Sequence, residues 1–92
     1  MIIRELAPSD LRGIGELVRR LHPKWFDKNA VANIPRDIRF QRCFVARDKG
    51  MVTGFISISC QDGEPKIGWM GVDPDLHRMG VGQKLLKRAE QT

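Results

Sequence analysis

The segment Val72–Leu86 reads VDPDLHRMGVGQKLL. Its pattern predicts a buried strand that ends at an Asp-Pro turn, followed by a glycine-bearing bend and an amphipathic helix. Helices usually begin after Ser, Thr, Asp or Asn, whose side chains accept hydrogen bonds from the first free amides. Here Arg78, Met79 and Gly80 precede the helix, and none has a side chain suited to that role. We therefore expect an anion to take up these amides, because a helix N-terminus carries partial positive charge.

Two glycines and an arginine in this bend favour a phosphate as the anion. Gly80 and Gly82 remove side chains that would keep a phosphate away from the backbone amides, and Arg78 adds a positive charge. A P-loop is excluded because the chain has no Gly-Lys-Ser or Gly-Lys-Thr in the required position. A dinucleotide fingerprint is excluded because Leu85 stands where its third glycine should be. The alternative is a strand-turn-helix connection whose glycines only allow tight packing.

The segment His77–Gly82, HRMGVG, resembles the signature of the GNAT superfamily of acyl-CoA-dependent N-acetyltransferases. In that signature, Gln or Arg is followed by two residues, Gly, one residue, and then Gly or Ala. His77 departs from the usual Gln or Arg, but Arg78 beside it can supply the charge. The preceding segment 67–74 resembles the fourth strand of the family and its following turn, and the segment 84–86 resembles the start of its central helix. The specific match therefore covers residues 67–86.

The hydrophobic pattern of the remaining chain predicts the element order β-α-α-β-β-β-α. A first strand around residues 2–6 is followed by a helix with Ser9 and Asp10 as cap residues. The segment 25–40 can form one irregular helix or two short ones broken at Pro35. The later elements are expected as strands over residues 42–47, 52–60 and 66–72, with turns at 48–50 and 62–65, and a helix over residues 81–89. Strands joined by such short turns form an antiparallel meander.

The resemblance implies an α+β fold with three layers, α/β/α, built on a mostly antiparallel four-stranded sheet. The family continues with further strands and a helix, whereas the last helical pattern of this chain reaches Thr92 without a terminating signal. We expect residues 1–92 to be a single, truncated acetyltransferase domain that lacks the C-terminal strands and helix; a natural minimal domain is the alternative. The fourth strand would then be an exposed edge, and we expect it to promote homodimerisation or aggregation.

The resemblance also implies transfer of an acetyl group from acetyl-CoA, as co-substrate, to a primary amine on a small molecule or a protein. The pyrophosphate would lie on the amides of residues 79–83, and amides of residues 70–72 would meet the developing oxyanion. The implied cofactor-binding residues are Met70, Gly71, Val72, His77, Arg78, Met79, Gly80, Val81, Gly82 and Gln83. Gly71 would let the pantetheine arm approach closely, or else marks a strand bulge.

The sequence indicates the catalytic groups less clearly than the cofactor-binding residues. Glu64 is the candidate general base, with Glu5 as another carboxylate, and turn or surface carboxylates are the alternative interpretation of both. The family commonly protonates the leaving thiolate with a Tyr, but this chain contains no Tyr. Trp25 and Phe26 fall in the segment that borders the acceptor pocket in the family, or they are core residues. The short chain is therefore expected to bind the cofactor but possesses no complete catalytic set.

Composition limits the other classes of function. The net charge of +5 permits an anionic partner, which can be nucleic acid, an acidic protein or a phosphorylated cofactor. No apolar run approaches the ~20 residues of a membrane helix. Cys43 and Cys60 are expected to be buried reduced thiols, and a disulfide or a metal site is the alternative. We expect a cytoplasmic protein without a metal. The alternatives to an enzyme are a non-catalytic acyl-CoA-binding module and a small basic nucleic-acid binder, which the scarcity of aromatic residues, at 7%, disfavours.

Overall fold

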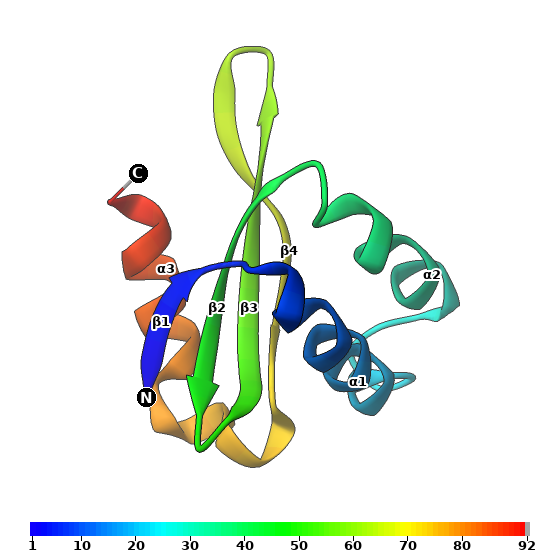
Figure 1. Cartoon of the computed structure of the whole chain (residues 1–92). Coiled ribbons are helices and arrows are strands. Elements are labelled where there is room, and N and C mark those ends of the chain that lie inside the picture. Colours follow the sequence, from blue (N-terminus) through cyan, green and yellow to red (C-terminus); the bar gives the residue numbers. More distant parts are fainter. Residues whose placement is uncertain (92) are drawn as a thin grey trace.

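A computed structural model of the chain describes residues 1–91, which form one sheet of four strands and helices on both of its faces (Figure 1). In chain order, the elements are β1 (Ile2–Glu5), the 3-10 helix η1 (Pro8–Asp10), α1 (Leu11–Leu21), α2 (Lys28–Asp37), β2 (Arg42–Asp48), β3 (Met51–Gln61), β4 (Glu64–Val72), the 3-10 helix η2 (Pro74–Met79) and α3 (Val81–Glu90). The order β-α-α-β-β-β-α expected from the sequence is confirmed.

The sheet is an antiparallel meander. Its strands lie in the order β1-β2-β3-β4, and each neighbouring pair is antiparallel. Two-residue turns, Lys49-Gly50 and Asp62-Gly63, join the last three strands, and all four of these residues have positive φ. Turns of this kind match the right-handed twist of paired strands. Because two residues complete the second turn, Glu64 and Pro65 belong to β4 and not to the turn in which the sequence placed them.

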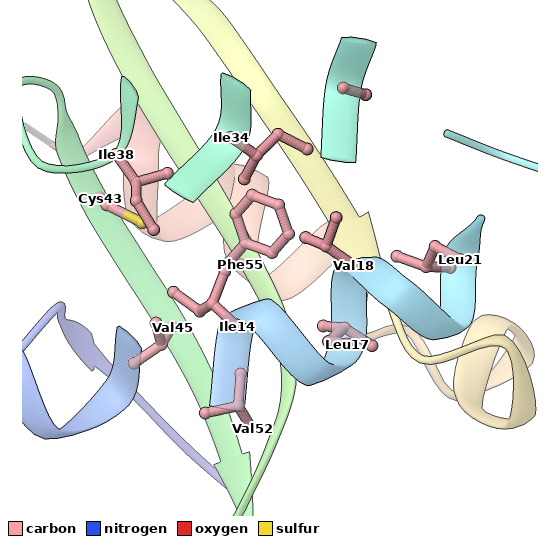
Figure 2. Close-up of a cluster of buried hydrophobic side chains, with 11 residues drawn as sticks. Ile14, Leu17, Val18, Leu21, Ile34, Ile38, Cys43, Val45, Val52 and Phe55 are labelled. Carbon is pink, nitrogen blue, oxygen red and sulfur yellow. The ribbon is translucent and has the colours of Figure 1, made fainter. Parts of the chain in front are cut away.

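The helices make three layers with the sheet. α1 and α2 cover one face, and α3 covers the other (Figure 1). Figure 2 shows the larger core, on the α1 and α2 side, where Phe55 of β3 lies among aliphatic side chains from both helices. The smaller core packs Val81 and Leu85 of α3 against Phe44 and Ile56 of the sheet. This arrangement confirms the expected α/β/α layering.

The segment after α1 forms one helix. Asp27 caps α2, since its Oδ1 accepts a hydrogen bond from the Ala30 amide at 2.8 Å. Pro35 lies inside the helix, and α2 ends two residues later at Asp37. A proline in this place removes one intrahelical bond near an end that would fray in any case. Of the two possibilities left open by the sequence, a single irregular helix is the one formed.

The sequence predicted Asp10 as a cap residue of α1, but its side chain does not cap this helix. It is fully buried and instead joins three parts of the chain. Its carboxylate accepts from Arg4 at 2.7 and 3.0 Å, from Arg47 at 2.6 Å and from the Ala7 amide at 2.8 Å. Burial alone would raise the pKa of Asp10, but these hydrogen bonds outweigh burial and hold the pKa below its ordinary value.

The two cysteines differ in environment. Cys43 is buried as expected, and burial, assisted by the nearby charge of Asp10, raises the pKa of its thiol to about 12. Cys60 is exposed, which corrects the prediction from its apolar neighbours. It lies near the tip of the β3–β4 hairpin, which extends beyond the helices (Figure 1).

Candidate functional site

The connection from β4 to α3 has the local structure that its sequence predicts. Asp73 follows β4, and its Oδ1 accepts a hydrogen bond from the Asp75 amide at 3.0 Å to begin η2. η2 ends at Gly80, which has φ 76°, in the left-handed region that favours glycine. Gly80 is also the N-cap of α3, and no side chain caps this helix. The first amides of α3, in residues 81–83, therefore have no acceptor within the helix.

A cleft of about 300 Å³ lies beside this connection. Its lining comes from the end of α1, the segment after it, the last part of β4, η2 and the first turn of α3, and consists of Leu21, Trp25, Phe26, Met70, Gly71, Val72, His77 and Gly82. Five of the ten predicted cofactor residues are thus brought together. Trp25 and Phe26, which sequence reasoning left between substrate contact and core, both line the cleft.

The other predicted cofactor residues lie along the same connection without lining the cleft. Arg78 and Gln83 are exposed, and the side chain of Met79 is 67% exposed. Val81 is 2% exposed, since its side chain belongs to the core under α3, so only its backbone can reach a ligand. Gly80 has open space where a side chain would begin.

His77 holds the connection against both β4 and the segment that follows α1. Its Nε2 lies 2.8 Å from the carbonyl oxygen of Val72, and its ring meets the ring of Trp25 edge-on, with centroids 5.0 Å apart. The residue that departs from the usual Gln or Arg therefore has a defined structural place. It forms one wall of the cleft and fixes the path of the chain after β4.

The free edge of β4 faces away from β3 along this cleft. The Asp73 amide donates to the carbonyl of Thr53 on β3 at 2.8 Å, so the amide of Asp73 points toward β3. In an antiparallel strand, the backbone groups of successive residues point alternately toward and away from the neighbouring strand. By that alternation the amides and carbonyls of Met70 and Val72 point outward, in agreement with the bond from His77 to the Val72 carbonyl. The amides of Met70 and Val72 and the Met70 carbonyl are available to pair with an extended ligand, whereas the Val72 carbonyl is already bonded to His77.

A bulge interrupts β4 before this edge. Met70 pairs with Ile56 and Ile67 pairs with Ile58, so Gly68 and Trp69 together oppose Ser57. The Trp69 amide donates to Ser57 Oγ at 2.8 Å. The bulge considered for Gly71 thus occurs earlier in the strand.

Gly71 has a packing role. A Cβ there would lie 2.8 Å from Phe55 Cε1 and 2.9 Å from Leu21 Cδ1, so only glycine fits. At Gly82 a Cβ would lie 3.0 Å from the terminal methyl of Met70, across the cleft. Gly71 therefore lets the core close beneath the cleft, whereas Gly82 leaves space within it.

The predicted carboxylates do not reach the cleft. Glu64 is exposed at the start of β4, six residues before Met70, which corresponds to about 20 Å along a strand. Glu5 lies on β1, at the opposite edge of the sheet, in an ion pair with Arg42. Sequence reasoning did not single out Asp37, whose Oδ2 accepts from the indole of Trp69 at 3.0 Å beside the bulge. Only the folded chain shows that α2 brings this carboxylate to β4.

The described residues meet the requirements of neither a metal site nor a membrane-spanning helix. Within residues 1–91, no three His, Cys, Asp or Glu side chains are placed to hold a metal ion. No helix in that range is long and apolar enough to cross a membrane.

Comparisons with known proteins agree with this geometry. S-(2-succino)cysteine N-acetyltransferase from Bacillus subtilis (strain 168) is 33% identical over 64 residues, which cover 62% of this chain and 39% of that enzyme. The GNAT family N-acetyltransferase YhbS from Escherichia coli, solved in complex with CoA, has a TM-score of 0.77 at 27% identity, covering 96% of this chain and 53% of its own. A GNAT family acetyltransferase from Brucella melitensis, solved with acetyl-CoA, has a TM-score of 0.79 at 24% identity, covering 98% and 66%.

This chain therefore spans about two fifths of the Bacillus subtilis enzyme and between half and two thirds of the two solved proteins. A model of the acetyltransferase (GNAT) domain matches residues 39–92, more than half of the chain, and includes the sheet edge, the turn and the uncapped helix described above. On that match, and on the fold shared with these acetyltransferases, the chain belongs to the GNAT acetyltransferase family.

Proposed function

We propose that this chain binds acetyl-CoA at the start of α3 and along the free edge of β4, as the cofactor-binding part of an N-acetyltransferase that acts on a primary amine. The observation that carries the proposal is the helix α3, which begins at Gly80 in the left-handed conformation with no side-chain cap and opens onto a cleft. The relatives solved with CoA and acetyl-CoA support the choice of ligand.

The start of α3 suits a pyrophosphate. The amides of residues 81–83 point out of the helix N-terminus, where the helix dipole adds partial positive charge. Arg78 and Lys84 are exposed on either side of these amides and add full charges. Gly82 leaves room at the rim of the cleft. Backbone donors of this kind recognise the phosphate without requiring a particular side chain at position 77.

The edge of β4 suits the pantetheine arm, which carries two amide groups. The outward amides of Met70 and Val72 and the Met70 carbonyl can pair with those groups as a neighbouring strand would. The reacting end would then lie toward the bulge at Gly68-Trp69. There, Phe26 and Trp69 meet edge-on with centroids 6.1 Å apart and provide an apolar wall.

Turnover needs a group to take a proton from the amine. An alkyl ammonium has a pKa near 10.4, so freeing its lone pair at pH 7 costs about 4.6 kcal/mol. Among the residues that line the cleft, only His77 is titratable, and its Nε2 is already bonded to Val72. Glu64 lies too far away to serve. We therefore expect acetyl-CoA binding with slow acetyl transfer by this chain; binding without any transfer is the behaviour of a non-catalytic acyl-CoA-binding module.

A titration followed by NMR tests the binding proposal. Addition of acetyl-CoA to the chain should shift the amides of residues 79–83 and of Met70 and Val72, with saturation. Shifts confined to other parts of the chain would refute it. An assay of free CoA thiol release with a panel of primary amines then separates the two functions: release that depends on the amine supports the transferase, and binding without release supports the module.

We also propose that two copies of the chain associate through β4. β4 is the outer strand of the described sheet, and Ile67 on it is 53% exposed. An exposed edge with an apolar side chain is a template for pairing with another strand. Light scattering should show a mass that rises with concentration, and a charged edge residue in Ile67→Lys should suppress this rise. A wild-type chain that stays monomeric at millimolar concentration would contradict the proposal.

A further inference from the structure

A second and larger cleft, of about 650 Å³, lies between α1 and the turn that joins β2 to β3. It shares no lining residue with the cleft beside α3. Four arginines surround it: Arg12, Arg19 and Arg20 from α1, and Arg47 from β2. These residues are scattered in the sequence, and the fold brings them around one space.

The periodicity of α1 explains why three of these four arginines lie on the same side of the helix. Arg12, Glu16, Arg19 and Arg20 stand at positions i, i+4, i+7 and i+8 of α1, which form one stripe of a helix. The opposite stripe, which includes Leu17 and Val18, is buried in the core. Because α1 packs against the sheet by that face, its charged stripe is directed along the edge of the cleft.

The cleft has more positive than negative charge, although Asp73 at the end of β4 neutralises Arg20, with 2.8 Å between Nη2 and Oδ2. Arg47 donates to the buried Asp10 and to the Gly50 carbonyl, but Asp10 also neutralises Arg4, so two guanidinium groups share one carboxylate. Glu16 is the only carboxylate in the lining, and its contact with Arg12, at 3.5 Å between exposed side chains, is weak. Arg19 has no hydrogen bond or ion pair within residues 1–91.

The floor of the cleft is apolar. Leu17 and Val52 are 1% and 6% exposed, and both line it. α1 lies close to β3 here, because a Cβ on Gly13 would be only 2.7 Å from Val52. Met51, at 60% exposure, stands at the rim. A ligand that fills this space would contact apolar side chains with its body and guanidinium groups with its anionic end.

We propose that this cleft binds a small organic phosphate, that is, a phosphate ester with a compact apolar body. Guanidinium groups bind phosphate oxygens through two parallel hydrogen bonds, which favours phosphate over a single-point anion. The volume falls within the range of small-molecule sites. Arg47 is held in place by two acceptors, and Arg19 and Arg12 retain free donors, so the site has both a fixed and an adjustable part.

The test uses phenyl phosphate as the probe, in about 150 mM KCl so that non-specific attraction is screened. The amides of Gly13 and Gly50 should shift with saturation as the probe is added. In Arg12→Gln/Arg19→Gln the affinity should fall about tenfold or more. Neither residue holds a strong partner, so the fold should survive, and the melting temperature verifies this. Arg39→Gln/Lys87→Gln, which removes the same charge from exposed positions elsewhere, should bind the probe as the wild type does.

Three results would overturn the proposal. The first is that the shifts at Gly13 and Gly50 fail the test, because they do not saturate or because both double variants lose them equally. The second is displacement of phenyl phosphate from these amides by saturating acetyl-CoA, which would show that the larger cleft is part of the acetyl-CoA site and not a separate phosphate site. The third is tighter binding of a short single-stranded DNA at the same amides with a steep salt dependence, which would make the cleft a nucleic-acid surface.

Discussion

Arg20 of α1 and Asp73 at the end of β4 form an ion pair, with Nη2 2.8 Å from Oδ2. The side chain of Asp73 is 11% exposed, and its other oxygen accepts the amide that begins η2. One carboxylate thus starts the connection to α3 and ties it to α1. The pair also separates the two clefts, since Arg20 lines the larger one and Val72, next to Asp73, lines the smaller.

Replacing Arg20 by Gln should loosen this connection. We expect the free energy of unfolding to fall by about 1 kcal/mol, because Arg20 is partly exposed and solvent screens the pair. The melting temperature should then drop by about 4–8 °C. Acetyl-CoA affinity should weaken several-fold, since the amides of residues 81–83 lose their fixed position. Thermal melting and isothermal titration measure the two effects.

Arg19→Gln is the matched control for Arg20→Gln. It removes the same charge from the neighbouring position, but Arg19 has no bonded partner within the described residues. Its melting temperature and acetyl-CoA affinity should remain close to those of the wild type. Equal effects of the two substitutions would show that net charge, and not the bond to Asp73, determines the behaviour of the connection.

Gly82 offers a way to block the cleft without straining the backbone. It lies within α3 and does not have the positive φ of Gly80, so Gly82→Val should keep α3 and change the free energy of unfolding by no more than about 1 kcal/mol. The added methyl groups would occupy the space toward Met70. We expect acetyl-CoA affinity to fall at least about tenfold, measured by isothermal titration.

Substitutions at Gly80 and Gly15 serve as comparisons for Gly82→Val. Gly80→Ala must place a side chain at φ 76°, which costs roughly 1–2 kcal/mol, so it should lower stability as well as affinity. Gly15→Ala meets only the end of Arg19, at 3.6 Å, and should stabilise α1 without affecting binding. If Gly82→Val bound acetyl-CoA as well as Gly15→Ala does, the cleft would not be the cofactor site.

The local structure of the β4–α3 connection was predictable, because it depends on short-range chemistry. The absence of a capping side chain before Val81 and the need for glycine at position 80 are properties of a few adjacent residues. The same holds for the hairpins at Lys49-Gly50 and Asp62-Gly63 and for the periodic face of α1. The predicted element order was correct for this reason, whereas the layering was predicted from the family resemblance.

Long-range placements could not be read in the same way. The bulge that opposes Gly68 and Trp69 to Ser57 depends on the register of two strands. Asp37 reaches Trp69 only because α2 packs beside β4. Glu64 was selected for its place in the sequence near β4, but the length of the strand puts it at the far end. Such errors arise because each residue of an extended strand adds about 3.3 Å, so residues that are close in the sequence can lie far apart in space.

The two cysteines should differ sharply in reactivity. The thiolate is the reactive species, so Cys43, buried and with its pKa raised to about 12, should react with iodoacetamide very slowly at pH 8. Cys60 is exposed and should be modified first. Mass spectrometry of a timed reaction should show one modification per chain, located at residue 60, and Cys60→Ser should abolish it. Rapid double modification of the native chain would show that the core around Cys43 opens readily.

Asp10 makes the free energy of unfolding depend on pH in the acid range. Its pKa in the folded chain lies below its ordinary value, because three donors stabilise the carboxylate. The unfolded chain, with a carboxyl pKa near 3.9, therefore binds a proton more readily than the folded chain does. The stabilisation by Asp10 is present above that unfolded value and is lost as the pH falls toward the folded pKa. This loss of stability begins at about pH 5 and continues as the pH falls further.

Asp10→Asn removes the charge but keeps the shape of the side chain. At pH 7 it should lower the free energy of unfolding by about 2–3 kcal/mol, less than for a fully buried pair because Arg4 and Arg47 are partly exposed. Between pH 5 and pH 2 the difference from the wild type should shrink, since the wild-type carboxyl becomes protonated and loses the same interactions. Urea unfolding at several pH values measures both quantities. A difference that stays constant down to pH 2 would mean that the carboxylate charge on Asp10 does not stabilise the fold, and that its hydrogen-bonding geometry alone joins β1, η1 and β2.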